Sequence, residues 1–238
     1  MIMKASSLAF LKKMLETPSP SGFETPAQEV WGAYLEPHAA RIEKDVYGNR
    51  LAVLNPKGFP RLMLAGHMDE VGLMVTHISD QGYLSFAAIG GVETAVLLAQ
   101  RVRVHTAKGP ILGVIGRKPI HLIKDEKEFP KMKDLWIDIG AKNGKEAKKL
   151  VAIGDPATLA VGCEALRNDL IVSRGLDDKV GAFVAAEALR LLATGGRKLR
   201  AAVYAVSTVQ EAEQPSPAVV LPSSQASVPA GTPSPQAG

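Results

Sequence analysis

The chain has 238 residues, of which 46% are hydrophobic and 22% charged, a balance typical of a soluble globular protein with one large domain or two smaller ones. Its net charge of +4 is spread along the sequence, so we expect no binding to nucleic acid. No run reaches the about 18 apolar residues of a membrane span, and no secretory signal precedes Ser6. We therefore expect a cytoplasmic protein that does not bind membranes. The single cysteine, Cys163, excludes an intrachain disulfide and a zinc site built from cysteines.

The N-terminal part of the chain predicts two helices. The first, Ser6 to Thr17, has an apolar stripe and carries lysines on its other face. The second begins at Thr25, Pro26 and Gln28, which we interpret as an N-cap, a first-turn proline and a capping-box partner. It is expected to end at about Glu36.

A β-hairpin and a short buried strand are predicted next. The runs 41–46 and 50–55 flank a Gly-Asn turn, which favours the hairpin. The apolar run 62–65 then leads directly to His67 and Asp69. Ligands gather outside the carboxyl ends of strands in open α/β sheets, and residues two apart face the same side. Asp69 is therefore placed to orient the imidazole of His67.

The pattern changes beyond residue 72, where short strands follow one another closely and glycine turns separate them. Closely spaced strands of this kind favour a small β-barrel or sandwich, inserted between two α/β halves. The expected strands are 71–78, 83–87, 101–106, 111–115, 135–139 and 158–161.

An α/β pattern returns after the insert. A strand at 170–173 leads through Asp177-Asp178 into a helix that Gly195-Gly196 ends. The following run, 201–206, is apolar throughout, as a central strand buried on both faces should be. We expect this sheet to need further neighbours on the far side of 201–206, which the chain does not supply.

Two acidic motifs in this half each allow two interpretations. Asp177-Asp178 opens a helix, where acids are favoured by the helix dipole, but a carboxylate there can also bridge two metal ions. Glu211 is either a polar residue at a strand exit or a general base. With His67 and Asp69 these residues all lie at strand or helix ends, which favours a metal-dependent hydrolase. A glycosidase that uses paired carboxylates is the weaker alternative.

Five motifs, in this order, resemble the glutamyl, deblocking and tetrahedral aminopeptidases of the dinuclear metallopeptidases. They are Thr17–Gly22, Gly66–Gly72, Lys118–His121, Leu176–Gly181 and Ser207–Glu211. The resemblance implies an α/β catalytic domain of three layers, interrupted by a β-rich, barrel-like domain used in oligomer assembly. It divides the chain into catalytic parts at 1–72 and 166–213 and an oligomerisation insert at 73–165, and leaves a Pro/Ser-rich tail at 214–238 that is expected to be disordered.

The resemblance also assigns roles to the candidate residues. It implies that His67 binds the first of two divalent ions, zinc or cobalt, and that Asp177 bridges both. Asp69 matches the acid that orients the histidine, and Glu211 matches the general base. Members of the family remove N-terminal residues from peptides as homo-oligomers, commonly dodecamers.

The chain departs from this pattern at Ala212, where the family has a second metal-binding glutamate. The family's later aspartate and histidine ligands should follow, but residues 214–238 contain no Asp, Glu or His. We therefore expect a truncated or frameshifted member that binds at most one ion and is impaired as an aminopeptidase. The alternative is a catalytically dead relative that acts as a binding or oligomer-joining subunit.

Overall fold

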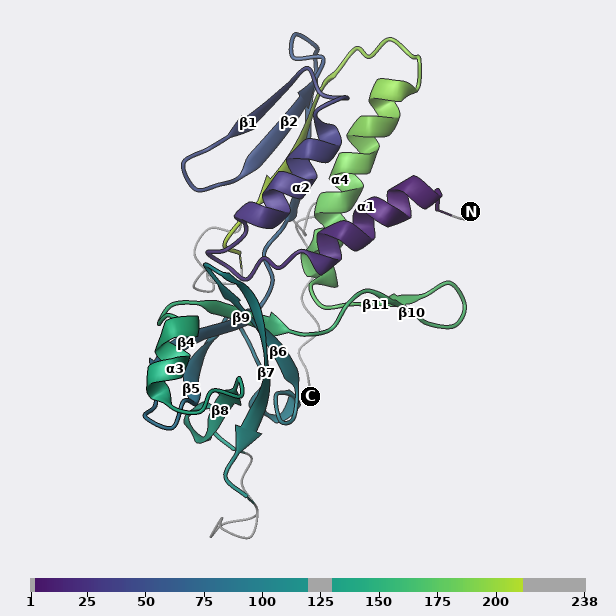
Figure 1. The fold of residues 1–238 in the computed structure, drawn as a ribbon. Coiled ribbons are helices and arrows are strands. Elements are labelled where there is room, and N and C mark those ends of the chain that lie inside the picture. The colour runs from purple at the N-terminus through teal and green to yellow at the C-terminus, as the bar shows by residue number, and fades with distance from the viewer. Residues whose placement is uncertain (1–2, 120–129, 212–238) are drawn as a thin grey trace, which may run out of the picture.

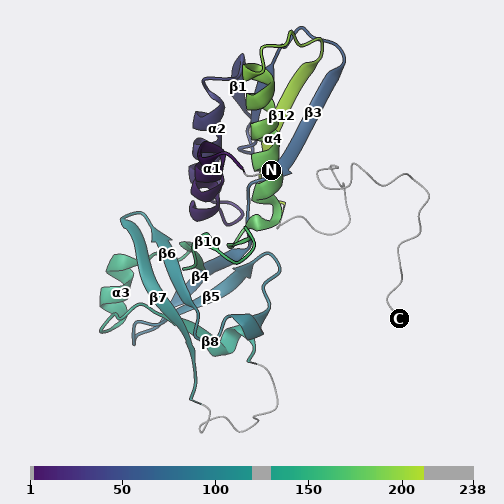
Figure 2. The same cartoon turned by 90° about the vertical axis from the view of Figure 1, so that its right-hand side faces the viewer.

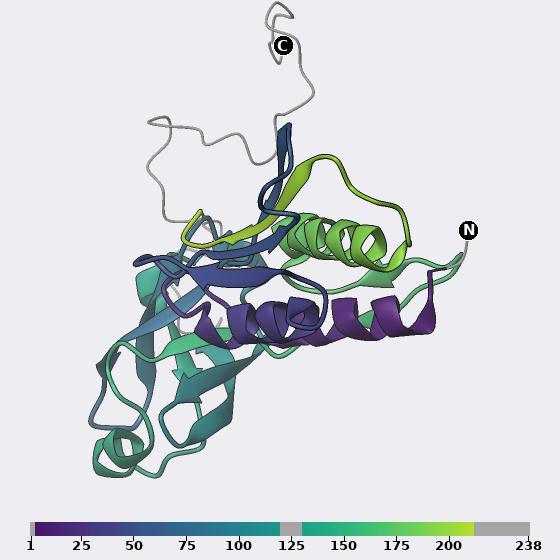
Figure 3. The same cartoon turned by 90° about the horizontal axis from the view of Figure 1, so that it is seen from above.

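The structure is a computed structural model that describes residues 3–119 and 130–211, and it consists of an α/β part and a β-barrel (Figure 1). In the α/β part, three helices lie on one face of a small mixed sheet (Figure 3). The predicted helices and the hairpin are confirmed. The helices are α1 (Ala5–Glu16), α2 (Thr25–Leu35) and α4 (Leu176–Thr194).

The sheet has the order β1-β2-β12-β3, and Figure 2 shows β12 and β3 side by side beside α4. Strand β12 is antiparallel to β2 and parallel to β3, so the predicted central strand has a partner on each side. The expectation that its far side lacks a neighbour is therefore wrong, and β3 forms the edge of the sheet instead. The strands are β1 (Arg41–Lys44), β2 (Arg50–Leu54), β3 (Arg61–His67) and β12 (Ala202–Thr208).

Helix α4 packs directly on β3 because Gly66 has no side chain. A Cβ atom at Gly66 would lie 2.2 Å from the backbone nitrogen of Ala182 on α4, which no real structure tolerates. From the other side, the fully buried indole of Trp31 donates a hydrogen bond of 2.9 Å to the carbonyl of Ala182. These contacts fix the start of α4 beside the end of β3.

The insert is a closed barrel with the strand order β4-β5-β8-β7-β6-β9, which confirms the predicted β-barrel. Its core is a separate apolar cluster that includes Val102, Ile115 and Ile137, all buried. The domain boundaries at 73 and 165 stay predictions. The barrel elements are β4 (Gly72–Ile78), β5 (Leu84–Ile89), η1 (Thr94–Val96), β6 (Arg101–Thr106), β7 (Gly109–Arg117), η3 (Met132–Asp134), β8 (Leu135–Asp138), α3 (Gly144–Leu150) and β9 (Pro156–Leu159).

Two local expectations are wrong. Helix α2 begins at Thr25 itself, its N-cap residue is Glu24, and no side chain caps it, so the capping box with Gln28 does not form. The strand expected at 170–173 is only β11 (Ile171–Val172), which pairs with β10 (Glu164–Ala165) in a separate ribbon. This ribbon lies outside the main sheet.

Some predictions fall on residues that the structure does not describe. The expected disorder of 214–238 and the end of the motif at Lys118–His121 are among them. No helix in the described part of the chain is long and apolar enough to cross a membrane.

The three helices are joined by polar contacts to one carboxylate, Glu187 of α4. Ser7 of α1 and Arg190 of α4 donate hydrogen bonds of 2.9–3.0 Å to it, and the Tyr34 hydroxyl of α2 donates another. Burial alone would raise the pKa of Glu187, but the hydrogen bonds from Arg190, Tyr34 and Ser7 outweigh burial and lower it to about 2.

We expect Glu187→Gln to lower the free energy of unfolding at pH 7 by about 1–3 kcal/mol, because three donors lose their charged acceptor. The ordinary pKa of the group is 4.5, so its contribution is present above that pH and is lost as the pH falls towards about 2. Urea unfolding at several pH values measures this. The difference in unfolding free energy between the wild type and Glu187→Gln should narrow below pH 4.5. Glu36→Gln, which changes an exposed acid at the end of α2, is the control and should unfold with the same free energy as the wild type. A gap that does not change with pH would contradict the prediction.

Candidate active site

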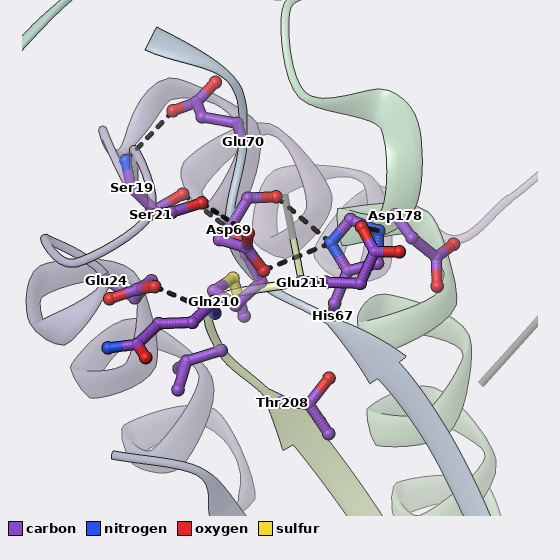
Figure 4. A network of polar contacts seen from close by, with 12 residues as sticks. Ser19, Ser21, Glu24, His67, Asp69, Glu70, Asp178, Thr208, Gln210 and Glu211 are labelled. Atoms are coloured by element: carbon purple, nitrogen blue, oxygen red, sulfur yellow. Dashed lines mark hydrogen bonds and ion pairs between the residues drawn. The ribbon is translucent and has the colours of Figure 1, made fainter. Parts of the chain in front are cut away.

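The candidate site lies where β3 and β12 end side by side. The two strands are parallel and in register, so that Thr208 of β12 is paired with His67 of β3 (Figure 4). Glu211 follows three residues beyond β12, and Asp177 lies in the first turn of α4. The sheet edge and the helix start therefore bring the predicted residues to one place.

The three other predicted site residues lie around the imidazole of His67. Its Nε2 atom lies 3.5 Å from Oδ1 of Asp177 and 3.7 Å from Oε2 of Glu211. On the other side of the ring, Nδ1 lies 3.4 Å from Oδ1 of Asp69 and 3.2 Å from the Asp69 carbonyl oxygen. Asp69 is fully buried, whereas the Asp177 and Glu211 side chains are 99% and 55% exposed. His67 itself is buried, and one ring nitrogen faces a buried carboxylate while the other faces two exposed ones.

The charge around His67 is strongly negative. Burial alone would lower the pKa of His67, but the hydrogen bond and charge of Asp69, together with the charges of Glu211 and Asp178, raise it to about 9. The same field favours any cation at this position. A site of this kind attracts either a proton or a metal ion to Nε2.

Asp177 and Asp178, which are joined by a cis peptide bond, perform different tasks. Neither has helical backbone angles, although both fall within the bounds of α4. Oδ1 of Asp178 accepts a hydrogen bond of 3.0 Å from the Gly181 amide, which is the contact of a helix N-cap. The two interpretations of this motif thus apply to different residues: Asp178 caps the helix, and Asp177 faces His67.

A buried ion cluster that the sequence reasoning missed lies behind the site. Oε1 of Glu70 lies 3.1 Å from Nζ of the fully buried Lys179 and accepts a hydrogen bond of 2.9 Å from the Ser19 amide. The other oxygen, Oε2, lies 3.2 Å from Nε of Arg174. Burial lowers the pKa of Lys179, although Glu70 opposes this. The available signal was an acid directly after the His-x-Asp pair and a lysine directly after Asp177-Asp178. The cluster ties these two segments together.

The geometry of His67 and Asp177 is compatible with a shared metal ion. Zinc bonds to nitrogen and oxygen are about 2.0–2.2 Å long, so two donors on one ion lie no more than about 4.3 Å apart. The 3.5 Å between Nε2 and Oδ1 satisfies this limit. Within residues 3–119 and 130–211, no group of three or more His, Cys, Asp or Glu side chains is arranged to hold a metal ion.

The chain is similar to proteins of one family. Residues 48–213 match the M42 glutamyl aminopeptidase family. The lysyl aminopeptidase of Pyrococcus furiosus is 34% identical over 206 residues, 84% of this chain. A TET aminopeptidase from a marine-sediment Thaumarchaeota archaeon is 37% identical over 87% of this chain, with a TM-score of 0.83. The TET1 peptidase of Pyrococcus horikoshii, which can assemble into a tetrahedron or a large octahedral shell, is 35% identical over 87%, with a TM-score of 0.79.

The chain spans less than two thirds of each of these proteins. It covers 58% of the lysyl aminopeptidase and 59% and 62% of the two chains of known structure.

We expect Glu70→Ala to lower the free energy of unfolding by about 3–5 kcal/mol, because it leaves the buried Lys179 ammonium without its counter-charge. Adding Lys179→Met should recover part of the loss, since the uncompensated charge is then removed as well. Urea unfolding of the wild type, both single variants and the double variant gives the coupling energy between the two residues. Strictly additive effects would show that the pair does not interact.

Proposed function

The chain belongs to the M42 glutamyl aminopeptidase family, and we propose on this basis that it forms the site of a metal-dependent aminopeptidase, which removes N-terminal residues from peptides. One observation supports this proposal most: the exposed carboxylates of Asp177 and Glu211 converge on Nε2 of His67, while the buried Asp69 lies at the opposite nitrogen. A surface ion cluster needs no such division between a buried and an exposed side.

His67 and Asp177 are the residues that would hold a divalent ion, zinc or cobalt. A bound ion of this kind polarises the scissile carbonyl and makes water more acidic. Asp69 keeps the proton of the imidazole on Nδ1, so that the lone pair of Nε2 points towards the exposed carboxylate of Asp177. The protein thus fixes both the tautomer and the direction of its histidine ligand.

Glu211 acts as the general base in this proposal. Its carboxylate lies 3.7 Å from Nε2 of His67 and is 55% exposed, so a water molecule and a peptide can reach it. Glu211 takes a proton from the attacking water and delivers it to the amine that leaves. Asp69 is fully buried and has no access to substrate, so its role is to position His67.

We further propose that the 238-residue chain holds at most one ion, and weakly. Ala212 has no ligand atom, and residues 214–238 contain no carboxylate or imidazole. A second ion has only Asp177 from the predicted ligand set, whereas a catalytic zinc normally has about three protein ligands. Activity is therefore reduced.

The alternative is a catalytically dead relative that binds peptides or joins a homo-oligomer through its barrel. The TET1 peptidase of Pyrococcus horikoshii, which is 35% identical over 87% of this chain, can assemble into a tetrahedron or a large octahedral shell. The barrel is closed and has its own core, and this alternative assigns the assembly contacts to it.

Elemental analysis of the purified chain should find no more than one divalent ion per chain. Hydrolysis of an aminoacyl p-nitroanilide should be weak or negligible, because the loss of one stabilising charge costs about a thousandfold in rate. Glu211→Gln should abolish any hydrolysis but leave the ion bound, and His67→Ala should remove the ion. Two tightly bound ions with rapid turnover would refute the one-ion proposal. Hydrolysis of glycosyl substrates alone would instead favour a glycosidase.

Asp69→Asn is expected to weaken metal binding by about 10–100-fold, because the histidine loses the group that fixes its tautomer. Competition with a chromogenic chelator measures this affinity. Asp80→Asn, which changes an exposed acid of the barrel, is the matched control and should bind the ion like the wild type. Equal affinities of the Asp69 variant and the wild type would remove Asp69 from the proposal.

A further inference from the structure

The loop between α1 and α2, residues 17–24, lines the buried side of the site. Figure 4 shows three of its residues, Ser19, Ser21 and Glu24, beside the segment that carries His67. The hydroxyl of Ser19 donates a hydrogen bond of 2.8 Å to the carbonyl of Met68. The hydroxyl of Ser21 donates one of 2.6 Å to Oδ2 of Asp69. The loop thus holds the residues that follow His67.

Glu24 makes the matching contact with the segment that carries Glu211. Its carboxylate is buried, with 5% of the residue exposed, and Oε1 accepts hydrogen bonds of 2.9 Å from the Gly22 amide and 3.0 Å from the Gln210 amide. Glu24 occupies the N-cap position of α2 but does not cap that helix. Its carboxylate instead ties the loop to the turn that follows β12.

The turn itself needs this support. Gln210 has a φ of 61°, the left-handed conformation that costs a residue with a side chain about 1–2 kcal/mol. It directs the chain away from β12 and places the Glu211 carboxylate 3.7 Å from Nε2 of His67. The amide of Val209, one residue earlier, donates a hydrogen bond of 2.9 Å to Oδ1 of Asn49. Both amides before Glu211 are therefore bound by side chains from remote parts of the sequence.

Glutamate at position 24 is difficult to explain as a purely structural residue. Burial of the carboxyl group is unfavourable and raises the pKa of Glu24, and the nearby Asp69 adds like charge. A serine or aspartate would serve α2 better as an N-cap. The glutamate side chain is long enough to reach the Gln210 amide, which an aspartate, shorter by one methylene group, would not reach from the same position.

We propose that Glu24 is a positioning residue for the base: it holds the Gln210 turn so that Glu211 faces His67, while Ser21 does the same for His67 through Asp69. This inference rests on the proposed function, because that function assigns Glu211 as the base. A misplacement of about 1 Å at such a group can cost about a hundredfold in rate. The loop 17–24 would then align the two halves of the site from one rigid support.

Hydrogen exchange at the Gln210 amide, measured by NMR on the metal-free chain, tests the contact without relying on activity. Glu24→Ala should speed exchange at Gln210 by about tenfold or more, because its acceptor is lost. Glu24→Gln keeps an oxygen at the same place and should retain the protection. The Ala205 amide in the middle of β12 should not change in either variant, nor should Gln210 in Glu36→Ala. Unchanged exchange at Gln210 in a folded Glu24→Ala chain would overturn the proposal.

Activity on an aminoacyl p-nitroanilide provides the second measurement. Glu24→Ala should lower kcat by about 10–100-fold with little change in KM, and Glu24→Gln should restore most of it. If Glu24→Ala does not fold, Glu24→Gln and Glu24→Asp decide between the outcomes. The Gln210 amide should stay protected from hydrogen exchange in Glu24→Gln and lose this protection in Glu24→Asp. Equal protection in both variants would overturn the proposal. If hydrolysis by the wild type is too weak to measure, which the one-ion proposal allows, the exchange result alone decides the positioning role.

Discussion

The parallel pairing of β12 with β3 is the contact on which the site depends. Its register sets Thr208 beside His67, so the two chain segments leave the sheet at the same edge. Gly66, one residue before His67, lets α4 approach β3 closely enough that Asp177 at the helix start reaches the same edge. Three segments that are far apart in the sequence thus meet because of one strand pairing and one missing side chain.

The buried charges behind the site come at a cost in stability. Each ion removed from water costs several kcal/mol, and only close partners offset this, whereas an ordinary hydrogen bond contributes about 1 kcal/mol. Glu70, Lys179 and Arg174 form such a set at 3.1–3.2 Å. At the contact between the barrel and the loop before α2, the ring of His105 stacks on Phe23 with the ring centres 5.9 Å apart. Burial together with Arg174 lowers the pKa of His105 to about 4, so this ring is neutral near pH 7.

Local signals in the sequence predicted most elements but not the contacts between remote segments. The helices, the hairpin and the barrel strands follow from periodicity and turn residues, and His67 and Asp177 stand out because they follow a strand and open a helix. The role of Glu24 was hidden, because Thr25 and Gln28 match a capping box locally while the real partner of Glu24 is Gln210. Likewise, nothing near β12 in the sequence states that its second neighbour is β3. Such pairings are decided by packing of the whole chain.

If the chain binds a divalent ion as proposed, the acids around His67 couple that binding to stability. Asp69, Asp177, Asp178 and Glu211 surround a single imidazole, and like charges so close together repel one another. A bound cation relieves this repulsion, and an ion that binds only the folded state stabilises it by about 2.7 kcal/mol when its concentration is about 100 times Kd. A two-ligand site with a high Kd gains little of this at ordinary metal concentrations. The increase in unfolding free energy on adding zinc or cobalt therefore reports how complete the ligand set is, independently of any catalysis.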